Sequence, residues 1–178
     1  MPEHMRTKFG MGRTFQITNV FTDMTLTENL VLAIIGTDRR KWIWYRSMAA
    51  FPAVRDQAMA GLDTVGLRHR ADDPVKLLSY GERRQLELAL ALNTNPKVLF
   101  LDEPCAGLDP VAREGLLAFL GRLIRRRKGP AVGLVTHHVE EIIPEFTHAL
   151  LLRGGKVAAA GPLDSTLTAG NLRTVFDS

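Results

Sequence analysis

The segment Val98-Leu99-Phe100-Leu101-Asp102-Glu103 decides the fold, because a short apolar run ends abruptly on two carboxylates. A continuous apolar run of this length is typical of a strand buried on both faces of a parallel sheet. Open α/β sheets bind ligands at the carboxyl ends of their strands, where Asp102 and Glu103 fall. One carboxylate could hold Mg²⁺ there while the other orients or deprotonates an attacking water. The alternative is that both residues only begin a surface loop before Pro104.

A second apolar run, Ala131–Val135, predicts another buried strand, and Thr136, His137 and His138 follow it. If the two strands are parallel, His137 comes to the same edge as the acidic pair, where it could hydrogen-bond a γ-phosphate. His138 is an alternative for this role, and a lone histidine is more often structural. No set of His, Cys and acidic residues has the spacing of zinc ligands.

The segment Leu78-Ser79-Tyr80-Gly81-Glu82 predicts the start of a helix that runs to about Asn93. Ser79 and Glu82 have the spacing of a capping box, a purely structural motif. A helix N-terminus that offers a hydroxyl and a glycine N–H is also a site for a phosphate oxygen. Both interpretations can hold together, and the flanking residues Leu77 and Arg83-Arg84-Gln85 favour the functional one.

The remaining pattern predicts an α/β core with a helical insertion, since residues 22–78 are mainly helical and 97–160 alternate strand and helix. A capping box at Thr25 and Glu28 begins one helix, and 67–77 is expected to be a polar loop. Asp109 is expected to cap a helix that starts at Pro110. That helix has the apolar stripe Leu116, Leu120, Leu123 and Ile124. Val139–Glu145 is expected as a short helix, and Gly154-Gly155 as a hairpin turn.

Composition limits the classes of protein that fit. The chain has 178 residues, 46% of them apolar, which suits one domain or most of one. Its net charge of +4 owes much to Arg122 and the run Arg125–Lys128. No aromatic residues interleave this cluster, so we interpret it as the basic end of a helix and expect no nucleic-acid partner. The single cysteine, Cys105, indicates an intracellular protein and reads as a small turn residue. The apolar stretch Leu30–Ile35 is too short to cross a bilayer.

In this order the motifs resemble those of ABC-family ATPase domains over nearly the whole chain. Each is ordinary alone, whereas five in sequence at family-like spacing are specific. The matching positions are Gln16 (Q-loop), Leu78–Glu82 (signature motif, with Tyr80 where many members have Gly), Val98–Glu103 (Walker B and catalytic glutamate), Ala106–Asp109 (D-loop) and His137 (H-loop).

The resemblance implies a partial P-loop NTPase (RecA-like) α/β core with an α-helical subdomain. It divides residues 1–178 into a helical subdomain with the signature helix (about 22–95), an α/β core (about 96–160) and a C-terminal helical tail (161–178). The segments Arg13–Gln16 and Leu78–Glu82 are similar to those of ATP-binding subunits of branched-chain amino-acid and urea importers. Asp102–Arg113 and His137–Glu141 look more like stand-alone molybdate-type ATP-binding proteins.

The resemblance also implies cofactors and catalytic roles, with ATP and Mg²⁺ bound between two such domains that close face to face. Asp102 would hold Mg²⁺, together with Gln16, and Glu103 would act as general base. His137 and Gln16 would sense the γ-phosphate and the attacking water.

Further roles implied by the resemblance concern partners. Ser79 and Gly81 would bind the γ-phosphate of the partner's ATP, and Asp109 would reach across the interface. Permease subunits would hold the chain as a cytoplasmic protein on the inner face of the membrane. Trp42, Trp44 and Tyr45 could line the docking groove for them, although core packing is the commoner role.

The phosphate-cradling motif G-x-x-x-x-G-K-[ST] is missing. The only Gly-Lys pair is Gly155-Lys156; Val157 follows it and Leu150 stands at the first glycine position. We therefore expect the last two-thirds of an ABC domain, without its N-terminal β-subdomain and P-loop. The isolated chain is expected to bind Mg-ATP weakly, to hydrolyse almost none and to expose apolar surface.

Three functions compete on this basis. The first is a truncated ATPase of an importer for amino acids or similar solutes. The second is a non-transport ABC ATPase, and the third is a non-hydrolytic subunit that offers only its signature helix to a partner. The intact Glu103 argues against the third.

Overall fold

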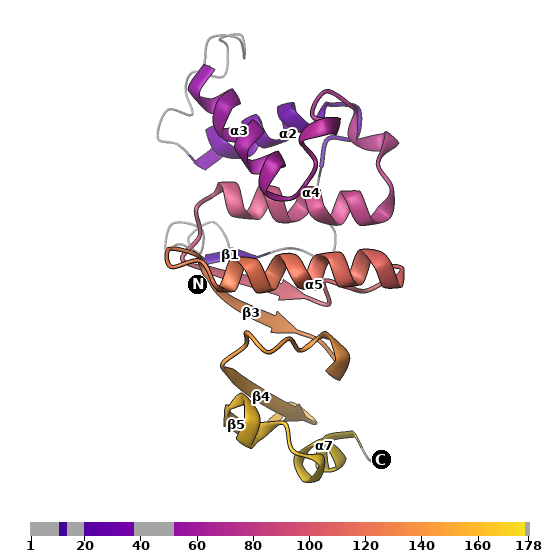
Figure 1. Ribbon diagram of the computed structural model, residues 1–178, viewed down its shortest axis with the longest axis vertical. Coiled ribbons are helices and arrows are strands. Elements are labelled where there is room, and N and C mark those ends of the chain that lie inside the picture. The colour runs from indigo at the N-terminus through magenta and orange to yellow at the C-terminus, as the bar shows by residue number, and fades with distance from the viewer. Residues whose placement is uncertain (1–10, 14–19, 38–51, 177–178) are drawn as a thin grey trace. The chain divides into compact units, whose positions relative to one another are not determined.

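The computed structural model describes residues 11–13, 20–37 and 52–176 (Figure 1). Gln16, Trp42, Trp44 and Tyr45 lie outside these ranges, so the roles predicted for them stay predictions. The chain forms two compact units, which meet in sequence between His137 and His138.

The helical part of the first unit consists of α2 (Leu26–Thr37), α3 (Pro52–Thr64) and α4 (Tyr80–Asn93), which contact one another pairwise. Two short 3₁₀ turns, η3 (Arg68–Arg70) and η4 (Val75–Leu77), lie where the sequence predicts a polar loop. The apolar faces of the helices form one core, because each contributes fully buried residues: Leu26, Leu30, Ala58, Leu62 and Leu86.

The start of α2 confirms the predicted capping box. The Thr25 N–H donates to Oε2 of Glu28 at 2.8 Å, and the Glu28 N–H donates to Oγ1 of Thr25 at 3.1 Å. The buried Asn29 then ties the helix to the preceding loop, since its Oδ1 accepts from the Phe21 N–H at 2.9 Å. The capping box thereby satisfies two backbone N–H groups at the start of α2, those of Thr25 and Glu28.

The sheet of the first unit has the strand order β1-β2-β3, built from β1 (Met11–Arg13), β2 (Val98–Asp102) and β3 (Ala131–Val135). Both pairings are parallel, and the register places Asp102 opposite Val135. The predicted parallel arrangement of the two apolar runs is therefore confirmed. Helix α5 (Pro110–Ile124) joins β2 to β3 and buries Leu116, Phe119, Leu120 and Leu123, while Ile124 is half-buried.

The prediction that β2 is buried on both faces is wrong, and β3, predicted as a second buried strand, is also partly exposed. Leu99 and Leu101 are fully buried, but Phe100 between them is 46% exposed and Val135 is 54% exposed. Alternation of this kind shows that one face of the sheet is covered and the other is open. The Phe100 ring lies over Gly133, its partner in the register, where an added Cβ would come within 2.7 Å of the ring.

The second unit begins with η5 (Val139–Glu141), which is shorter than the predicted helix Val139–Glu145. Pro144 explains the difference, because a proline disfavours helical backbone at the residue before it. The antiparallel hairpin β4 (His148–Arg153) and β5 (Lys156–Pro162) confirms the predicted turn. Gly154 and Gly155 have φ values of +55° and +74°, as a type I′ turn requires.

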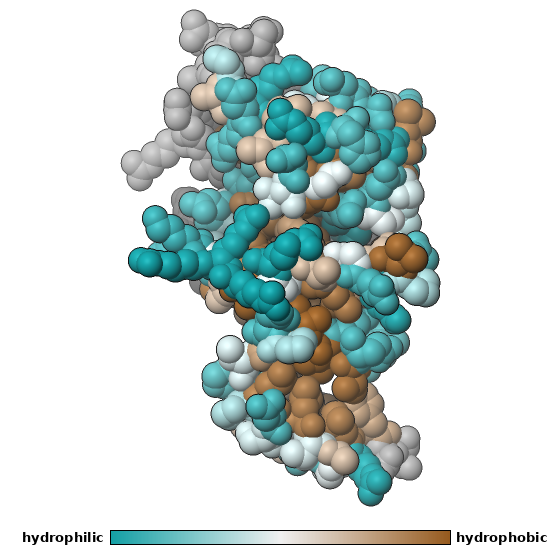
Figure 2. Space-filling model, in the orientation of Figure 1, coloured by the Kyte–Doolittle hydropathy of each residue, from teal (hydrophilic) through white to brown (hydrophobic). Residues whose placement is uncertain are grey.

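Apolar surface covers part of this hairpin (Figure 2), and its exposed apolar residues are Leu150, Leu152 and Val157. Two short helices, α6 (Leu163–Thr166) and α7 (Ala169–Phe176), complete the unit. None of the helices in the described ranges combines the length and apolarity needed to cross a bilayer.

Candidate active site

The carboxylate of Glu103 meets the imidazole of His137 at the edge of the sheet where β2 and β3 end. The Glu103 N–H donates to the carbonyl of Val135 at 2.9 Å, which extends the parallel ladder by one bond beyond β2. From this position Oε1 of Glu103 lies 2.7 Å from Nδ1 of His137. An ionised carboxylate can only accept, so with Glu103 ionised the contact requires the tautomer that is protonated at Nδ1. Asp102 is the last residue of β2 at the same edge.

The second oxygen of this carboxylate differs from the first in its hydrogen bonding. Oε2 of Glu103 is buried and has no hydrogen-bond partner among the described residues. The Glu103 side chain is 23% exposed, whereas His137 is 68% exposed. Buried acceptors are normally paired, so an unpaired one next to an exposed imidazole marks a place for a donor from water or substrate.

Backbone geometry at Glu103 is unusual for a residue with a side chain, since its φ is +44°. The left-handed region costs non-glycine residues free energy and persists only where surrounding contacts hold it. Such positions cluster at functional sites.

Arg84 of α4 supplies some of those contacts, and the sequence interpretation missed it as a site residue. Its Nε donates to the carbonyl of Pro104 at 3.0 Å, and its Nη2 lies 3.2 Å from the carbonyls of both Asp102 and Glu103. Its Nη1 contacts Oε2 of Glu87 at 2.6 Å. The sequence marks Arg84 only as a member of the flank Arg83-Arg84-Gln85, although its spacing from Glu87 puts these two residues on one face of the helix.

The start of α4 confirms the second predicted capping box. The Ser79 N–H donates to Oε2 of Glu82 at 2.8 Å, and the Glu82 N–H donates to Oγ of Ser79 at 3.3 Å. Ser79 is exposed, so its hydroxyl proton remains available to a ligand. Arg70 braces the box from η3, with Nη1 2.7 Å from Oε1 of Glu82.

These contacts lower the pKa of Glu82. Partial burial alone would raise it, but the Ser79 backbone N–H and the Arg70 guanidinium outweigh that effect. The carboxylate at the start of α4 therefore stays ionised, which favours an ordered first turn.

A cavity of about 250 Å³ unites the start of α4 with the turn before α5. Ser79, Gly81 and Asp109 all line it. The ring of Tyr80, which also lines the cavity, packs against Gly107, since a Cβ at that glycine would lie 3.3 Å from the ring. Asp109 also caps α5 as predicted, because its Oδ1 accepts from the N–H groups of Val111 and Ala112 at 2.9 Å each.

The predicted site residues therefore fall into two groups within the first unit. Glu103 and His137 form one, and Ser79, Gly81 and Asp109 form the other. His138, the alternative histidine, belongs to the second unit and lies 3.3 Å from Oε1 of Glu140 through its Nδ1. Cys105 is buried, as expected of a small turn residue.

Asp102 is the residue predicted to hold Mg²⁺. Within the described ranges no group of three or more His, Cys, Asp and Glu side chains could hold one. Mg²⁺ in nucleotide sites takes one or two protein carboxylates and completes its shell with phosphate and water. The carboxylate of Asp102 at the sheet edge suits that donor set.

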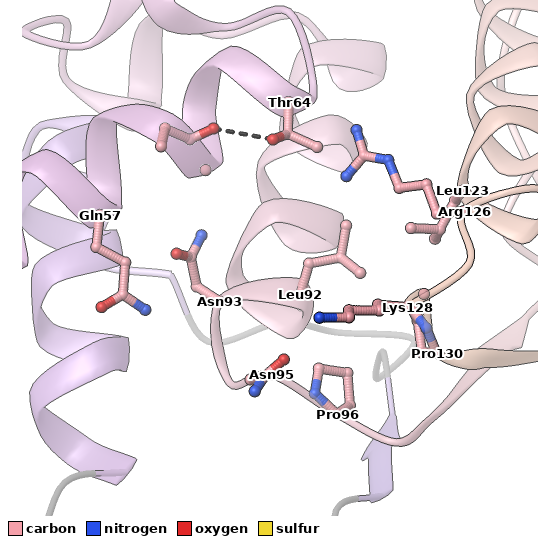
Figure 3. A pocket seen from close by; sticks show the side chains of 13 residues that line it. Gln57, Thr64, Leu92, Asn93, Asn95, Pro96, Leu123, Arg126, Lys128 and Pro130 are labelled. Atoms are coloured by element: carbon pink, nitrogen blue, oxygen red, sulfur yellow. Dashed lines mark hydrogen bonds between the residues drawn. The ribbon is translucent and has the colours of Figure 1, made fainter.

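Another cavity, of about 290 Å³, lies elsewhere in the first unit (Figure 3). Gln57 and Thr64 of α3, Asn93 at the end of α4, and Arg126 and Lys128 line it. Figure 3 shows the side chains of Gln57 and Asn93 on one side and Lys128 on the other. None of the predicted site residues contributes to it.

The first unit thus contains a parallel sheet that ends on a carboxylate–imidazole pair and, separately, a capped helix N-terminus that lines a cavity. Comparison with known proteins gives the family: the family model described as ABC transporter matches residues 2–106. The chain belongs to the ABC transporter family.

Its relatives are ATP-binding proteins of that family. It is 40% identical over 124 residues to the ABC transporter ATP-binding protein YlmA of Bacillus subtilis, which covers 70% of this chain and 47% of YlmA. It is 30% identical to the high-affinity branched-chain amino acid transport protein BraF of Pseudomonas aeruginosa (90% and 65% covered). It is 29% identical to the lipopolysaccharide export protein LptB of Haemophilus influenzae (99% and 68% covered).

These values have two consequences. The sequence identities to an import protein and to an export protein are nearly equal, at 30% and 29%. The predicted resemblance to amino-acid importers is therefore not confirmed as the subtype of this chain. The chain also spans only about half to two-thirds of these relatives, from 47% to 68% of their length.

Solved structures agree on the fold. The ADP conformation of an ATP-binding cassette of an ABC transporter matches with a TM-score of 0.79 at 23% identity, covering 100% of this chain and 72% of that one. A dimeric ATP-binding cassette in a post-hydrolysis state, bound to ADP and Pi, matches with a TM-score of 0.72 at 25% identity, covering 92% and 68%. The predicted α/β P-loop NTPase class is thereby confirmed.

Proposed function

We propose that this chain provides the γ-phosphate-reactive groups and the signature helix of an ATP-binding subunit in an ABC transporter. The observation that carries the proposal is the 2.7 Å contact between Glu103 and His137 at the carboxyl edge of the parallel sheet. A carboxylate there, oriented by an imidazole and with one oxygen unpaired, is arranged to take a proton from a water molecule.

On this proposal Glu103 is the general base and accepts the proton of the attacking water on Oε2. His137 orients the carboxylate through Nδ1 and turns its exposed ring to the γ-phosphate. Asp102 would hold Mg²⁺, with Gln16 as a second ligand; when bound, the ion neutralises charge that develops on the phosphoryl group.

The second group of residues would serve another molecule. Ser79 and Gly81 lie at an exposed helix N-terminus, where a hydroxyl and backbone N–H groups can bind a phosphate oxygen. We propose that they bind the γ-phosphate of ATP held by a second ABC ATPase domain, and that Asp109 contacts that domain. The ATP-binding cassette bound to ADP and Pi is dimeric, which supports this arrangement.

Permease subunits are the proposed membrane partners, which would place the chain on the cytoplasmic side of the membrane. Import of amino acids or similar small solutes is proposed on the likeness to BraF. The triphosphate-cradling motif is not among these 178 residues. The proposal therefore assigns to them the groups that act on the γ-phosphate and leaves the cradle unassigned.

The test is Mg-ATP hydrolysis by the assembly that co-purifies with the tagged chain from its native membranes. Glu103→Gln keeps the size of the side chain but removes the base, and we expect it to lower kcat by about 100-fold or more. Glu114→Gln, an exposed carboxamide change on α5, is the matched control and should leave kcat within about twofold. Equal hydrolysis by the wild type and Glu103→Gln, or none by the wild type, would overturn the proposal.

A further inference from the structure

We propose that Arg84 is the positioning residue for Glu103: its guanidinium holds the backbone turn from which the Glu103 carboxylate reaches His137. The catalytic consequence rests on the function proposed above, whereas the positioning itself is a property of this chain and can be tested without ATP.

The contacts of Arg84 converge on one short stretch of backbone. Its Nε and Nη2 together reach the carbonyls of three consecutive residues, Asp102, Glu103 and Pro104, at 3.0 to 3.2 Å. A side chain that bonded one carbonyl could cap a loop anywhere. Three successive carbonyls aimed at one guanidinium indicate that the turn is shaped around it.

Glu87 fixes the orientation of the guanidinium from the other side. Its Oε2 lies 2.6 Å from Nη1 of Arg84, and the two side chains are only 16% and 12% exposed. Low exposure removes competition from water, so the pair has one geometry rather than many. The planar fork of arginine can bond several acceptors at once, whereas a lysine ammonium is a point charge on a flexible stem.

Both backbone polar groups of Glu103, its N–H and its carbonyl, are consequently hydrogen-bonded. Its N–H donates to Val135 in β3, and its carbonyl accepts from Arg84 in α4. Between these two bonds its φ is +44°, a conformation that relaxes if either bond is lost. Relaxation would swing the side chain away and break the 2.7 Å contact with His137.

The arrangement also connects the two groups of site residues. Arg84 lies on α4, one turn after the segment that carries Ser79 and Gly81. Helix α4, which would face a partner's nucleotide, therefore also hydrogen-bonds, through Arg84, the backbone of Glu103, the proposed base of this chain.

The experiment follows the imidazole N–H of His137 by NMR in the chain labelled with ¹⁵N-histidine, with the signal assigned by its loss in His137→Gln. In the wild type, Nδ1–H donates to Glu103 and should exchange with water more slowly than the N–H of an imidazole that makes no such bond. In Arg84→Lys, we expect the exchange to be about tenfold faster or the signal to be lost, because the turn is no longer clamped.

Arg83→Lys is the matched control. It makes the same chemical change one position earlier, where the guanidinium contacts the carbonyl of Lys76 and not the acidic turn. We expect the His137 signal to persist in it. Arg84→Met/Glu87→Met covers the case in which Arg84→Lys does not fold, since it removes the charge pair while keeping apolar packing; it too should lose the signal.

A His137 signal unchanged in a folded Arg84→Lys or in the double variant would overturn the positioning role, whatever the assembly does with ATP. In the native assembly, Arg84→Lys should lower kcat by about 10-fold to 100-fold with KM within about twofold. If the His137 signal is lost in Arg84→Lys while the wild-type assembly hydrolyses no ATP, the positioning role of Arg84 is supported and the proposed function is rejected.

Discussion

Nδ1 of His137 lies 2.7 Å from Oε1 of Glu103, although 34 positions of sequence separate the two residues. Parallel pairing of β2 with β3 closes that separation, because it brings the ends of both strands to one edge. The hydrogen-bond ladder continues to the Glu103 N–H, so backbone pairing fixes the position from which the Glu103 carboxylate reaches the imidazole.

The two adjacent histidines should differ sharply in their effect on hydrolysis. His137→Gln removes the group that orients Glu103, and we expect kcat of the native assembly to fall by about 100-fold. His138→Gln changes a side chain that contacts Glu140 instead, and kcat should stay within about twofold. Steady-state hydrolysis by both variants checks this, and equal losses would contradict the assignment of His137.

Stability should depend on pH through Glu82. The folded-state pKa of this carboxyl is lowered, so its stabilising contribution is complete above the unfolded-state pKa and is lost as pH falls through the folded-state pKa. Glu82→Gln should therefore lower the free energy of unfolding by about 1–2 kcal/mol at pH 7, and the difference should shrink below about pH 4. Urea unfolding at both pH values measures it.

The control for this change is Glu114→Gln, which alters an exposed carboxylate and should cost less than about 0.5 kcal/mol at pH 7. A penalty for Glu82→Gln that persisted undiminished at pH 3 would show that its packing, and not its charge, stabilises the start of α4.

The structural and functional roles of Asp109 can be separated. Asp109→Ala deletes the cap of α5 and should cost about 1 kcal/mol of unfolding free energy, whereas Asp109→Asn keeps an accepting oxygen and should cost only a few tenths. If Asp109 also serves a partner through its charge, hydrolysis by the assembly should fall in both variants. Thermal unfolding combined with hydrolysis measurements distinguishes a cap from an interface residue, since a pure cap would leave Asp109→Asn fully active.

The open face of the sheet should promote self-association of the chain. Phe100 and Val135 expose large apolar surfaces there, which favours contact between molecules. Phe100→Thr keeps strand propensity and should shift sedimentation velocity profiles toward the monomer. Leu77→Thr removes an exposed leucine from η4 and serves as control; an equal shift in both would deny the sheet face any special role.

The sequence alone predicted those elements whose signals are local. Capping boxes at Ser79 and Thr25, the cap at Asp109 and the turn at Gly154-Gly155 each depend on residues a few positions apart, and all are confirmed. The parallel strands followed from apolar runs of the right length.

Features that depend on distant partners were not predictable in the same way. Nothing local to Phe100 shows that one face of β2 is open, because strand burial depends on what packs above it. Arg84 looks like any exposed arginine of a surface helix until the fold places three carbonyls in front of it. The helix predicted over Val139–Glu145 is only the short η5, Val139–Glu141, because Pro144 disfavours helical backbone at the residue before it.

The left-handed backbone at Glu103 has a consequence for which residues are favoured at this position. Glycine or asparagine adopts a φ of +44° more readily than glutamate does, so Glu103→Gly should relieve strain in the turn. A library of random variants selected only for resistance to heat would therefore enrich replacements at this position and discard the proposed base. A glutamate in this conformation trades backbone stability for the chemistry proposed for its carboxylate.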